Sequence, residues 1–458
     1  MSNTTTLDRP GNRRFLRRIT LATAWGEGLD GYDLGAISVV VALITQQLHI
    51  SSGWVGLIGA SSLLGIFIGA PVFGYLTDRF GRRRLFTLDL AVFLVAGVLQ
   101  AFTETGWQLF VLRLILGLAI GAEYAIGAPM LAEFVPSRDR GLRLCLLEVW
   151  WYAGFLISVL IGYGLLELGV NWRWILATSA VPALVTLILR IGLPESPRWL
   201  MSQGRTEEAR QIVTKYLGGD AYFDAEDFSG ESQQRVGLRR LFARDIRGRT
   251  IFVCTFWACL VAPYFAIFTF APQVLSSLSL SGARAGTIAI NGLAAVGAVA
   301  GLFIVERFGR RQMLIGPFWI SAAALFIVGF WVHAPSLIII IAFAAYAFFN
   351  AVSGDLTAVY PAEVFSTEVR TSGVGLASAA SRIGAAIGTW LLPIGISSIG
   401  VGPCMVIGGV MCVIGALISQ FMAPETTGRT LTRIGLLAPA SSLGIKAGPL
   451  PTTDRGSS

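Results

Sequence analysis

The chain has 458 residues, of which 54% are hydrophobic and only 14% are charged, and its formal net charge is +8. So little charge cannot cover the surface of a soluble domain, and the mean hydropathy of +0.68 likewise excludes a soluble globular fold. The basic residues lie in short loops between apolar runs, so they indicate membrane topology and exclude a nucleic-acid partner.

Apolar runs of the length that crosses a bilayer, about 20 residues, fill most of the chain. The first six are residues 19–43, 53–77, 85–103, 107–134, 144–168 and 172–193. A polar stretch at 194–249 follows, with an amphipathic segment at Thr206 to Leu217. The second six are residues 250–278, 283–305, 312–333, 335–362, 370–395 and 401–423. We therefore predict an all-α membrane protein with twelve transmembrane helices embedded in a lipid bilayer.

The basic loops predict the orientation and the regions of the chain. Arginines gather in alternate loops, which the positive-inside rule assigns to the cytoplasm, so both termini should be cytoplasmic. The predicted regions are a cytoplasmic tail at 1–18, a six-helix bundle at 19–193, a cytoplasmic linker with short helices at 194–249, a second six-helix bundle at 250–423 and a cytoplasmic tail at 424–458.

The two halves of the chain repeat short motifs at an offset of about 230 residues. The repeated pairs are Asp78–Arg83 with Glu306–Arg311, Glu133–Arg140 with Glu363–Arg370, and Pro194-Glu195 with Pro424-Glu425. Several motifs at one offset predict two pseudo-symmetric bundles related by an axis along the membrane normal. Two such bundles facing each other are what alternating access to a small-molecule site requires.

Charged residues inside the apolar runs are costly in a membrane and so mark candidate functional positions. The first run carries Glu27, Asp30 and Asp33, whose three-residue spacing places neighbours near one face of a helix. Like charge and burial prevent all three from being ionised in a dry site, which suits a proton carrier. Other such positions are Arg113, Glu123, Glu148, Asp355 and Arg382, with Asn291 as a weaker polar signal.

The segment Gly74 to Arg84, read with Pro194 to Leu200 and Pro424 to Arg429, resembles the major facilitator superfamily. The likeness covers residues 19–430 and is closest to the sugar-porter-type branch. It implies a monomeric secondary transporter with no cofactor. It also implies a cytoplasmic gate of ion pairs, whose residues are Asp78, Arg82, Arg83, Glu133, Arg140, Glu306, Arg310, Glu363 and Arg370. The alternative is that these arginines only obey the positive-inside rule.

The proton site follows from the same resemblance. The segment from Gly31 to Ser38 resembles the first helix of sugar porters, in which the aspartate accepts the proton, so Asp33 is the predicted proton site. Arg113 is its predicted partner, and protonation of Asp33 would release it. Asp30 and Glu123 stay open as first proton acceptors. A static buried ion pair is the alternative.

The substrate class is read from two further features. The seventh run lacks the polar motif that binds sugar hydroxyls in typical sugar porters. Instead, Asp30 to Asp33 and Tyr360 to Gly388 resemble the aromatic-acid and organic-anion proton symporters. That resemblance predicts import of a small, possibly aromatic, carboxylate held by Arg382. The other predicted substrate-site residues are Asp355, Glu148, Trp151, Tyr124, Tyr264 and Asn291.

Three alternatives stay open for function and site. Arg382 could instead form a salt bridge with Asp355, and the solute could be a sugar or polyol, or an exported compound. The chain has only His49 and His333, both at expected outer ends, so no catalytic or metal site is expected. Arginine-rich, Gly/Ala-rich composition suggests a bacterial inner membrane.

Overall fold

The computed structural model describes residues 10–135, 137–217, 238–278, 282–365 and 369–426. Within these ranges twelve segments are long and apolar enough to cross a membrane, as predicted. Part of the segment expected as an N-terminal tail is helical, because the first helix already begins at Pro10. Most of the predicted tail at 424–458 lies outside the described residues, and the predicted region boundaries stay predictions.

The N-terminal half forms one bundle and two short helices beyond it. Its bundle elements are α1 (Pro10–Leu48), α2 (Ser52–Phe80), α3 (Arg82–Leu99), the 3-10 helix η2 (Gln100–Phe102), α4 (Gly106–Phe134), α5 (Ser137–Glu167), α6 (Trp172–Ala177) and α7 (Ala180–Arg190). The short helices are α8 (Pro197–Ser202) and α9 (Thr206–Leu217). The α9 range coincides with the predicted amphipathic segment.

The C-terminal half repeats this arrangement. Its elements are the 3-10 helix η3 (Leu238–Phe242), α11 (Arg247–Thr269), α12 (Ala271–Ser277), α13 (Ala283–Phe308), α14 (Arg310–Phe330), α15 (Ser336–Gly354), α16 (Leu356–Val364), α17 (Arg370–Ile399) and α18 (Val401–Met422). Three spans expected as single helices are interrupted, between α6 and α7, α11 and α12, and α15 and α16. At α12 the cause is Pro272 in the first turn, which cannot donate a backbone hydrogen bond to α11.

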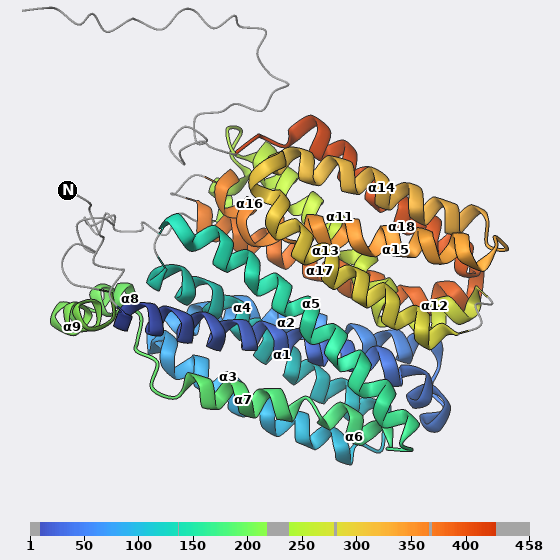
Figure 1. The fold of residues 1–458 in the computed structure, drawn as a ribbon, viewed down its shortest axis with the longest axis horizontal. Coiled ribbons are helices and arrows are strands. Elements are labelled where there is room, and N and C mark those ends of the chain that lie inside the picture. The colour runs from blue at the N-terminus through green and yellow to red at the C-terminus, as the bar shows by residue number, and fades with distance from the viewer. Residues whose placement is uncertain (1–9, 136, 218–237, 279–281, 366–368, 427–458) are drawn as a thin grey trace, which may run out of the picture.

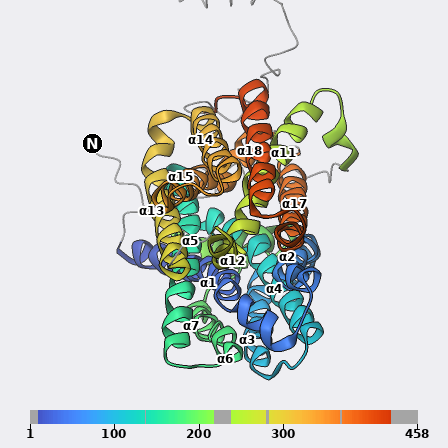
Figure 2. The same cartoon turned by 90° about the vertical axis from the view of Figure 1, so that its right-hand side faces the viewer.

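The two bundles lie side by side with their helices running along the same axis (Figure 1). Seen end on, the helices of the N-terminal half occupy one side of the molecule and those of the C-terminal half the other (Figure 2). Helices α8 and α9 lie at one end, outside both bundles. We call this end the basic end, because it contains the α2–α3 turn at Gly81 and the α13–α14 turn at Gly309.

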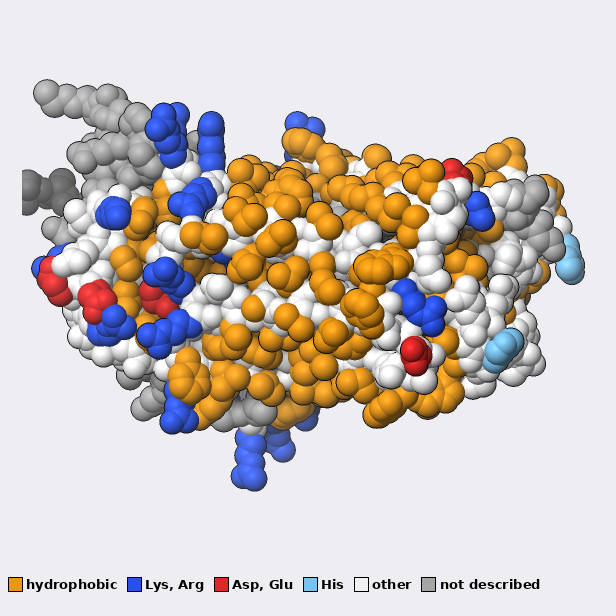
Figure 3. Space-filling view, turned by 90° about the horizontal axis from the view of Figure 1, so that it is seen from below, with side chains coloured by type: hydrophobic (Ala, Val, Ile, Leu, Met, Phe, Trp, Pro, Cys, Tyr) orange, Lys and Arg blue, Asp and Glu red, His pale blue; other side chains and the backbone are white. Residues whose placement is uncertain are grey.

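The surface matches a membrane protein. Figure 3 shows hydrophobic side chains around the middle of the molecule, with Lys and Arg side chains gathered at one end and histidines at the other. Exposed large side chains such as Phe303, Phe421 and Ile188 are more than half accessible. In water such a band would be an aggregation hazard, whereas in a bilayer it meets lipid.

Inside the N-terminal bundle, glycines let α1 and α5 touch through their backbones. A Cβ atom on Gly154 would lie 1.9 Å from the carbonyl oxygen of Gly28, and one on Gly31 would lie 2.0 Å from that of Trp151. Small residues at helix contacts are the usual way that membrane helices pack closely. This contact fixes the rotation of α1 and thereby the direction in which its carboxylates point.

The two bundles meet through α2 with α17, α5 with α13, and α1 with α11 and α12. At the end opposite the basic end, a Cβ atom on Gly56 of α2 would lie 2.1 Å from the carbonyl oxygen of Trp390 of α17. The bundles are therefore in direct backbone contact at this end.

Candidate functional site

Asp33 and Arg113 are brought together inside the N-terminal bundle. Asp33 Oδ2 lies 3.5 Å from Arg113 Nη2, and neither side chain is more than 1% exposed. Their charged atoms have no hydrogen-bond partner among the described residues. The pair is thus held by charge alone, in a medium where an ion pair is costly to bury.

Glu123, predicted as an alternative proton acceptor, lies in a different ion pair. Its carboxylate contacts the guanidinium of Arg190, at the end of α7, which also approaches Asp89 of α3. Neither Arg190 nor Asp89 was among the predicted site residues. The sequence did contain a signal for them, because both lie inside apolar runs, where a charged side chain is costly and marks a candidate functional position.

Arg382 of α17 lies at the boundary between the bundles. Its side chain is buried, with 9% of the residue exposed. Its Cζ atom is 5.0 Å from the ring centroid of Tyr124 in the N-terminal bundle and 5.4 Å from that of Phe265 in the C-terminal bundle. A guanidinium between two aromatic faces is stabilised by cation–π attraction.

No carboxylate in the described part of the chain lies within ion-pair distance of Arg382. Glu148 and Glu27 are near enough to interact with it electrostatically. Asp355 does not pair with it either, and both Asp355 carboxyl oxygens lack a hydrogen-bond partner among the described residues. The alternative of an Arg382–Asp355 salt bridge is therefore not what the structure contains. Glu148 instead accepts a hydrogen bond of 3.3 Å from Thr357 Oγ1 across the bundle boundary.

An aromatic cluster adjoins Arg382 and includes two predicted residues. Trp151 of α5 lies 6.0 Å from Tyr264 and 5.8 Å from Phe265, measured between ring centroids. Sequence reasoning missed its other members, which are Tyr152, Phe155, Phe268 and Tyr346. Trp151 Nε1 and the hydroxyls of Tyr264 and Tyr346 have no hydrogen-bond partner in the described ranges. Buried donors of this kind suit a polar solute.

Asn291 forms a hydrogen bond within its own helix. Its side-chain amide donates a hydrogen bond of 2.8 Å to the carbonyl of Thr287 on α13. One of its donors is therefore already used within the helix, and its place in the substrate site stays a prediction.

At the basic end, the N-terminal half contains a compact charge network. Glu133 is paired with Arg82 and accepts a hydrogen bond from the Ser196 hydroxyl. Glu195 accepts hydrogen bonds from the backbone amides of Arg82 and Arg83 at 3.0 and 3.1 Å. This carboxylate therefore occupies the N-terminus of α3, where the helix dipole favours negative charge.

The C-terminal half repeats the network at matching positions. Glu363 lies 3.5 Å from Arg310 and accepts a hydrogen bond of 2.6 Å from the Thr426 hydroxyl. Glu425 accepts from the backbone amides of Arg310 and Arg311 at 3.1 and 3.3 Å. The two turns before these helices use glycines with left-handed φ angles, +94° and +80°.

Among the predicted gate residues, Glu133 contacts Arg82 and Glu363 contacts Arg310. The side chains of Arg140, Glu306 and Arg370 lie outside the described residues, so their part in the gate stays a prediction. Asp78 is exposed, and its carbonyl oxygen accepts a hydrogen bond of 3.0 Å from Trp199 Nε1.

Residues 19–437 match the family described as "Sugar (and other) transporter". The chain belongs to this family. The Escherichia coli strain K12 protein named "Putative metabolite transport protein YaaU" is 37% identical over 91% of this chain and 94% of its own. The inner membrane metabolite transport protein YgcS of the same strain is 35% identical over 93% of this chain and 95% of its own.

Some relatives of this transporter are named for a solute, and those described next have lower sequence identity than YaaU and YgcS. The D-xylose transporter of Levilactobacillus brevis is 31% identical over 94% of this chain and 97% of its own. The niacin transporter NiaP of Acinetobacter baylyi is 26% identical over 90% of this chain and 95% of its own. A solved structure of the major facilitator superfamily proton:xylose symporter XylE has a TM-score of 0.77, with 25% identity over 92% of this chain and 99% of its own.

Family membership confirms the predicted fold class and class of activity. This chain is a multi-pass membrane transporter of the major facilitator superfamily and not an enzyme, and transporters of this kind work without a cofactor. Its helices form the predicted two bundles, with the Asp33–Arg113 pair inside the first and Arg382 at their boundary.

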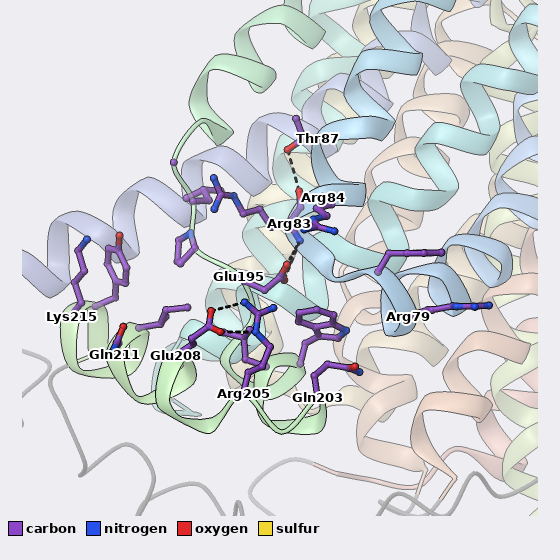
Figure 4. A pocket seen from close by; sticks show the side chains of 18 residues that line it. Arg79, Arg83, Arg84, Thr87, Glu195, Gln203, Arg205, Glu208, Gln211 and Lys215 are labelled. Carbon is purple, nitrogen blue, oxygen red and sulfur yellow. Dashed lines mark hydrogen bonds and ion pairs between the residues drawn. The ribbon is translucent and has the colours of Figure 1, made fainter.

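A cleft of about 1040 Å³ opens at the basic end of this transporter, away from the bundle boundary. Figure 4 shows Arg83 bound through its backbone to Glu195, and Arg205 in a two-fold contact with Glu208. The hydrogen bonds from Arg205 lower the pKa of the exposed Glu208 carboxyl below its usual value. The residues that line this cleft belong to α2, α3 and the segment that contains α8 and α9, so the cleft is separate from Arg382 and the Asp33–Arg113 pair.

Proposed function

We propose that this transporter imports a small organic carboxylate together with protons. Arg382 is the observation that carries the proposal. It is a buried cation at the bundle boundary, and in the described residues no carboxylate pairs with it. An arginine in that position is expensive to keep in a membrane unless something binds it. The binding partner that fits is an anion brought by the solute.

The geometry around Arg382 favours a carboxylate. A guanidinium offers two parallel N–H groups that match the two oxygens of a carboxylate. Tyr124 and Phe265 place aromatic rings beside it, at 5.0 and 5.4 Å from Cζ to the ring centroids. Trp151 and Tyr264 extend the same aromatic surface, which suits a planar ring attached to the carboxylate.

Asp33 and Arg113 support the proton-coupling part of the proposal. Protonation of Asp33 would remove the charge that holds Arg113, and the pair would separate without breaking a hydrogen bond. The similar structure, XylE, is named as a proton symporter, which agrees with this role. Asp30 stays a candidate for an earlier proton acceptor.

A sugar is the second candidate solute. The unpartnered Trp151 Nε1 and the Tyr264 and Tyr346 hydroxyls are groups that bind hydroxyl-rich solutes. Relatives named for D-xylose agree with that reading, whereas a relative named for niacin, whose ring carries a carboxylate, agrees with the first. We favour the carboxylate because a sugar would leave the Arg382 charge unpaired.

We further propose that the basic end faces the cytoplasm of a bacterial inner membrane, that both termini lie there, and that one copy of the chain suffices for transport. The gathering of Lys and Arg at one end supports this orientation (Figure 3). The latch role of the charge networks at that end is part of the same proposal.

The experiment is uptake into proteoliposomes with and without an inward proton gradient. The solutes are benzoate, 4-hydroxybenzoate, nicotinate, propionate, D-xylose and D-glucose. We expect gradient-driven accumulation of a carboxylate. Arg382→Ala should lower its uptake by about a hundredfold, because one partner of a buried charge pair is worth about 2–5 kcal/mol.

Two variants serve as controls. Arg382→Lys keeps the charge but loses the paired N–H groups, so it should retain partial uptake. Arg244→Ala removes an exposed arginine outside the membrane spans and should leave uptake unchanged. Accumulation of a sugar that is indifferent to Arg382→Ala would return the chain to sugar transport and leave Arg382 a structural charge.

A further inference from the structure

A second group of buried charges lies inside the N-terminal bundle, apart from the Asp33–Arg113 pair. It consists of Asp89 of α3, Glu123 of α4 and Arg190 of α7, each at most 4% exposed. Arg190 Nη2 is paired with Glu123, and Arg190 Nη1 lies 3.8 Å from Asp89 Oδ2. One guanidinium therefore serves two carboxyl groups.

The guanidinium of Arg190 is held in place by α3. Its Nη1 donates a hydrogen bond of 3.0 Å to the carbonyl oxygen of Phe86, and its Cζ atom lies 3.4 Å from the Phe86 ring centroid. Phe86 and Asp89 are three residues apart on α3, so they present the ring and the carboxyl from one face. These contacts hold the Arg190 guanidinium beside Asp89.

Helix α1 closes the group from the opposite side and leaves space for it. A Cβ atom on Gly26 would lie 2.2 Å from Glu123 Oε1 and 2.3 Å from Arg190 Nη2. A side chain at this position would have to displace the ion pair, so α1 contributes a bare backbone surface against it. The group is therefore enclosed by four helices.

Among the described residues, Arg190 is the one cation that both carboxyl groups approach, through its Nη2 atom for Glu123 and its Nη1 atom for Asp89. Two negative charges against one positive charge would leave a net charge buried in the membrane. One proton between the two acids removes that net charge.

Asp30 connects this group to the coupling pair. Asp30 is 1% exposed, its Oδ2 has no hydrogen-bond partner among the described residues, and it interacts electrostatically with Glu27, Asp89, Glu123 and Arg190. It lies three residues before Asp33, so the two share a face of α1. The charged groups at this site are therefore Glu27 and Asp30 of α1, together with Asp89, Glu123 and Arg190.

We propose that Asp89 and Glu123 share one proton, clamped by Arg190, and that this is a second proton-binding site of the transport cycle. The proton moves alone: when it leaves, both acids are ionised against one arginine, and the site must take a proton back. Asp89 lies about 10 Å along α3 from the start of this helix at the basic end. The site therefore lies between Asp33 and the basic end. Its role in transport rests on the proposed proton coupling, whereas the shared proton does not.

The shared proton is tested by infrared absorption of the full chain in lipid nanodiscs near neutral pH, in H2O and in D2O. Asp89→Asn and Glu123→Gln each leave one carboxylate for Arg190, so both variants remain charge-balanced and should fold. We expect each to remove the same protonated-carboxyl band, and the double variant to remove no more. Glu104→Gln, an exposed acid, should keep the band. If the protonated-carboxyl band that Asp89→Asn removes stayed in folded Glu123→Gln, or the reverse, the proposal would be overturned.

The role in transport is tested with the panel solute that wild-type vesicles accumulate. Asp89→Asn and Glu123→Gln should lower gradient-driven accumulation by at least about tenfold, as for loss of a positioned proton carrier, while solute exchange without net proton movement continues. Loss of the band with accumulation intact would make the site a static proton and overturn its role in the cycle. If wild-type vesicles accumulate no solute of the panel, the proposed function fails, and the infrared result alone decides the shared proton.

Discussion

Two buried arginines near the centre of the molecule differ in what accompanies them. Arg113 has Asp33 at 3.5 Å, whereas Arg382 has aromatic rings and, in the described residues, no carboxylate within ion-pair distance. A cation with a fixed partner can respond to protonation of that partner, and a cation without one can take a partner from a solute. The two side chains therefore suit the two tasks of a symporter, proton coupling and anion binding.

At this scale, Asp33→Asn should uncouple transport from the proton gradient. The amide keeps the shape of the carboxyl but cannot bind or release a proton, and it leaves Arg113 permanently free of its partner. In proteoliposomes the variant should equilibrate solute without concentrating it, while exchange of internal for external solute persists.

Asp245→Asn provides the matched control, because Asp245 is exposed, lies outside the membrane spans and is paired with Arg240. Concentrative uptake should survive in that variant. Equally concentrative uptake by Asp33→Asn would show that the coupling proton binds elsewhere.

At the scale of helices, the contact between α1 and α5 determines which way the carboxylates of α1 point. Backbone approach at Gly28, Gly31 and Gly154 leaves no space for a side chain between them. Trp151 and Tyr152 lie on the other flank of α5, toward α11. Helix α5 thus packs against one bundle and presents aromatic residues to the other.

Gly154→Ala should lower stability, since a single methyl group would lie 1.9 Å from the Gly28 carbonyl oxygen. Overpacking of this kind costs about 1–3 kcal/mol, which thermal unfolding in detergent would measure. Gly164→Ala on the same helix has nothing within 4 Å of the new atom, so it should be neutral or slightly stabilising. Equal melting temperatures for the two variants would mean that the α1–α5 contact is looser than described.

The carboxylates at the starts of α3 and α14 should contribute equally. Glu195→Gln and Glu425→Gln each remove a negative charge from a helix N-terminus, at a cost of about 0.3–1 kcal/mol. The two sites lie in different bundles, so the costs should add in the double variant. Thermal unfolding of the three variants checks this, and a large effect of only one of them would show that the repeated networks are not equivalent.

At the scale of the whole molecule, the bundles touch where α2 meets α17. The Gly56–Trp390 contact has no space for a side chain, so it depends on this end being closed. Alternating access requires that the same contact open when the basic end closes. Gly56 is therefore a position where a larger residue changes the balance between conformations.

Gly56→Leu should shift the population toward the conformation that is open at this end. Spin labels at Trp107 and Leu337, exposed residues of the two bundles at the same end, should report longer distances than in the unsubstituted protein. Gly53→Leu is the control on α2, because a Cβ atom there meets only Ser51 Oγ at 3.9 Å. Unchanged distances in Gly56→Leu would show that the contact does not limit opening.

The sequence by itself determined the twelve spans, the repeat of the two halves and the pairing of Asp33 with Arg113. Hydropathy and residue spacing are properties of single segments, so they predicted the spans and the repeat. The Asp33–Arg113 pair was predicted from the resemblance of two motifs to those of sugar porters. Only the tertiary structure decided which charges share a site when they lie on different helices. Arg190 joined Glu123 and Asp89, Arg382 turned toward Tyr124 and Phe265 instead of Asp355, and Glu133 contacted Arg82. The rotation of each helix, set by close backbone contacts such as Gly28 with Gly154, decides these neighbours, and no pattern within one segment contains it.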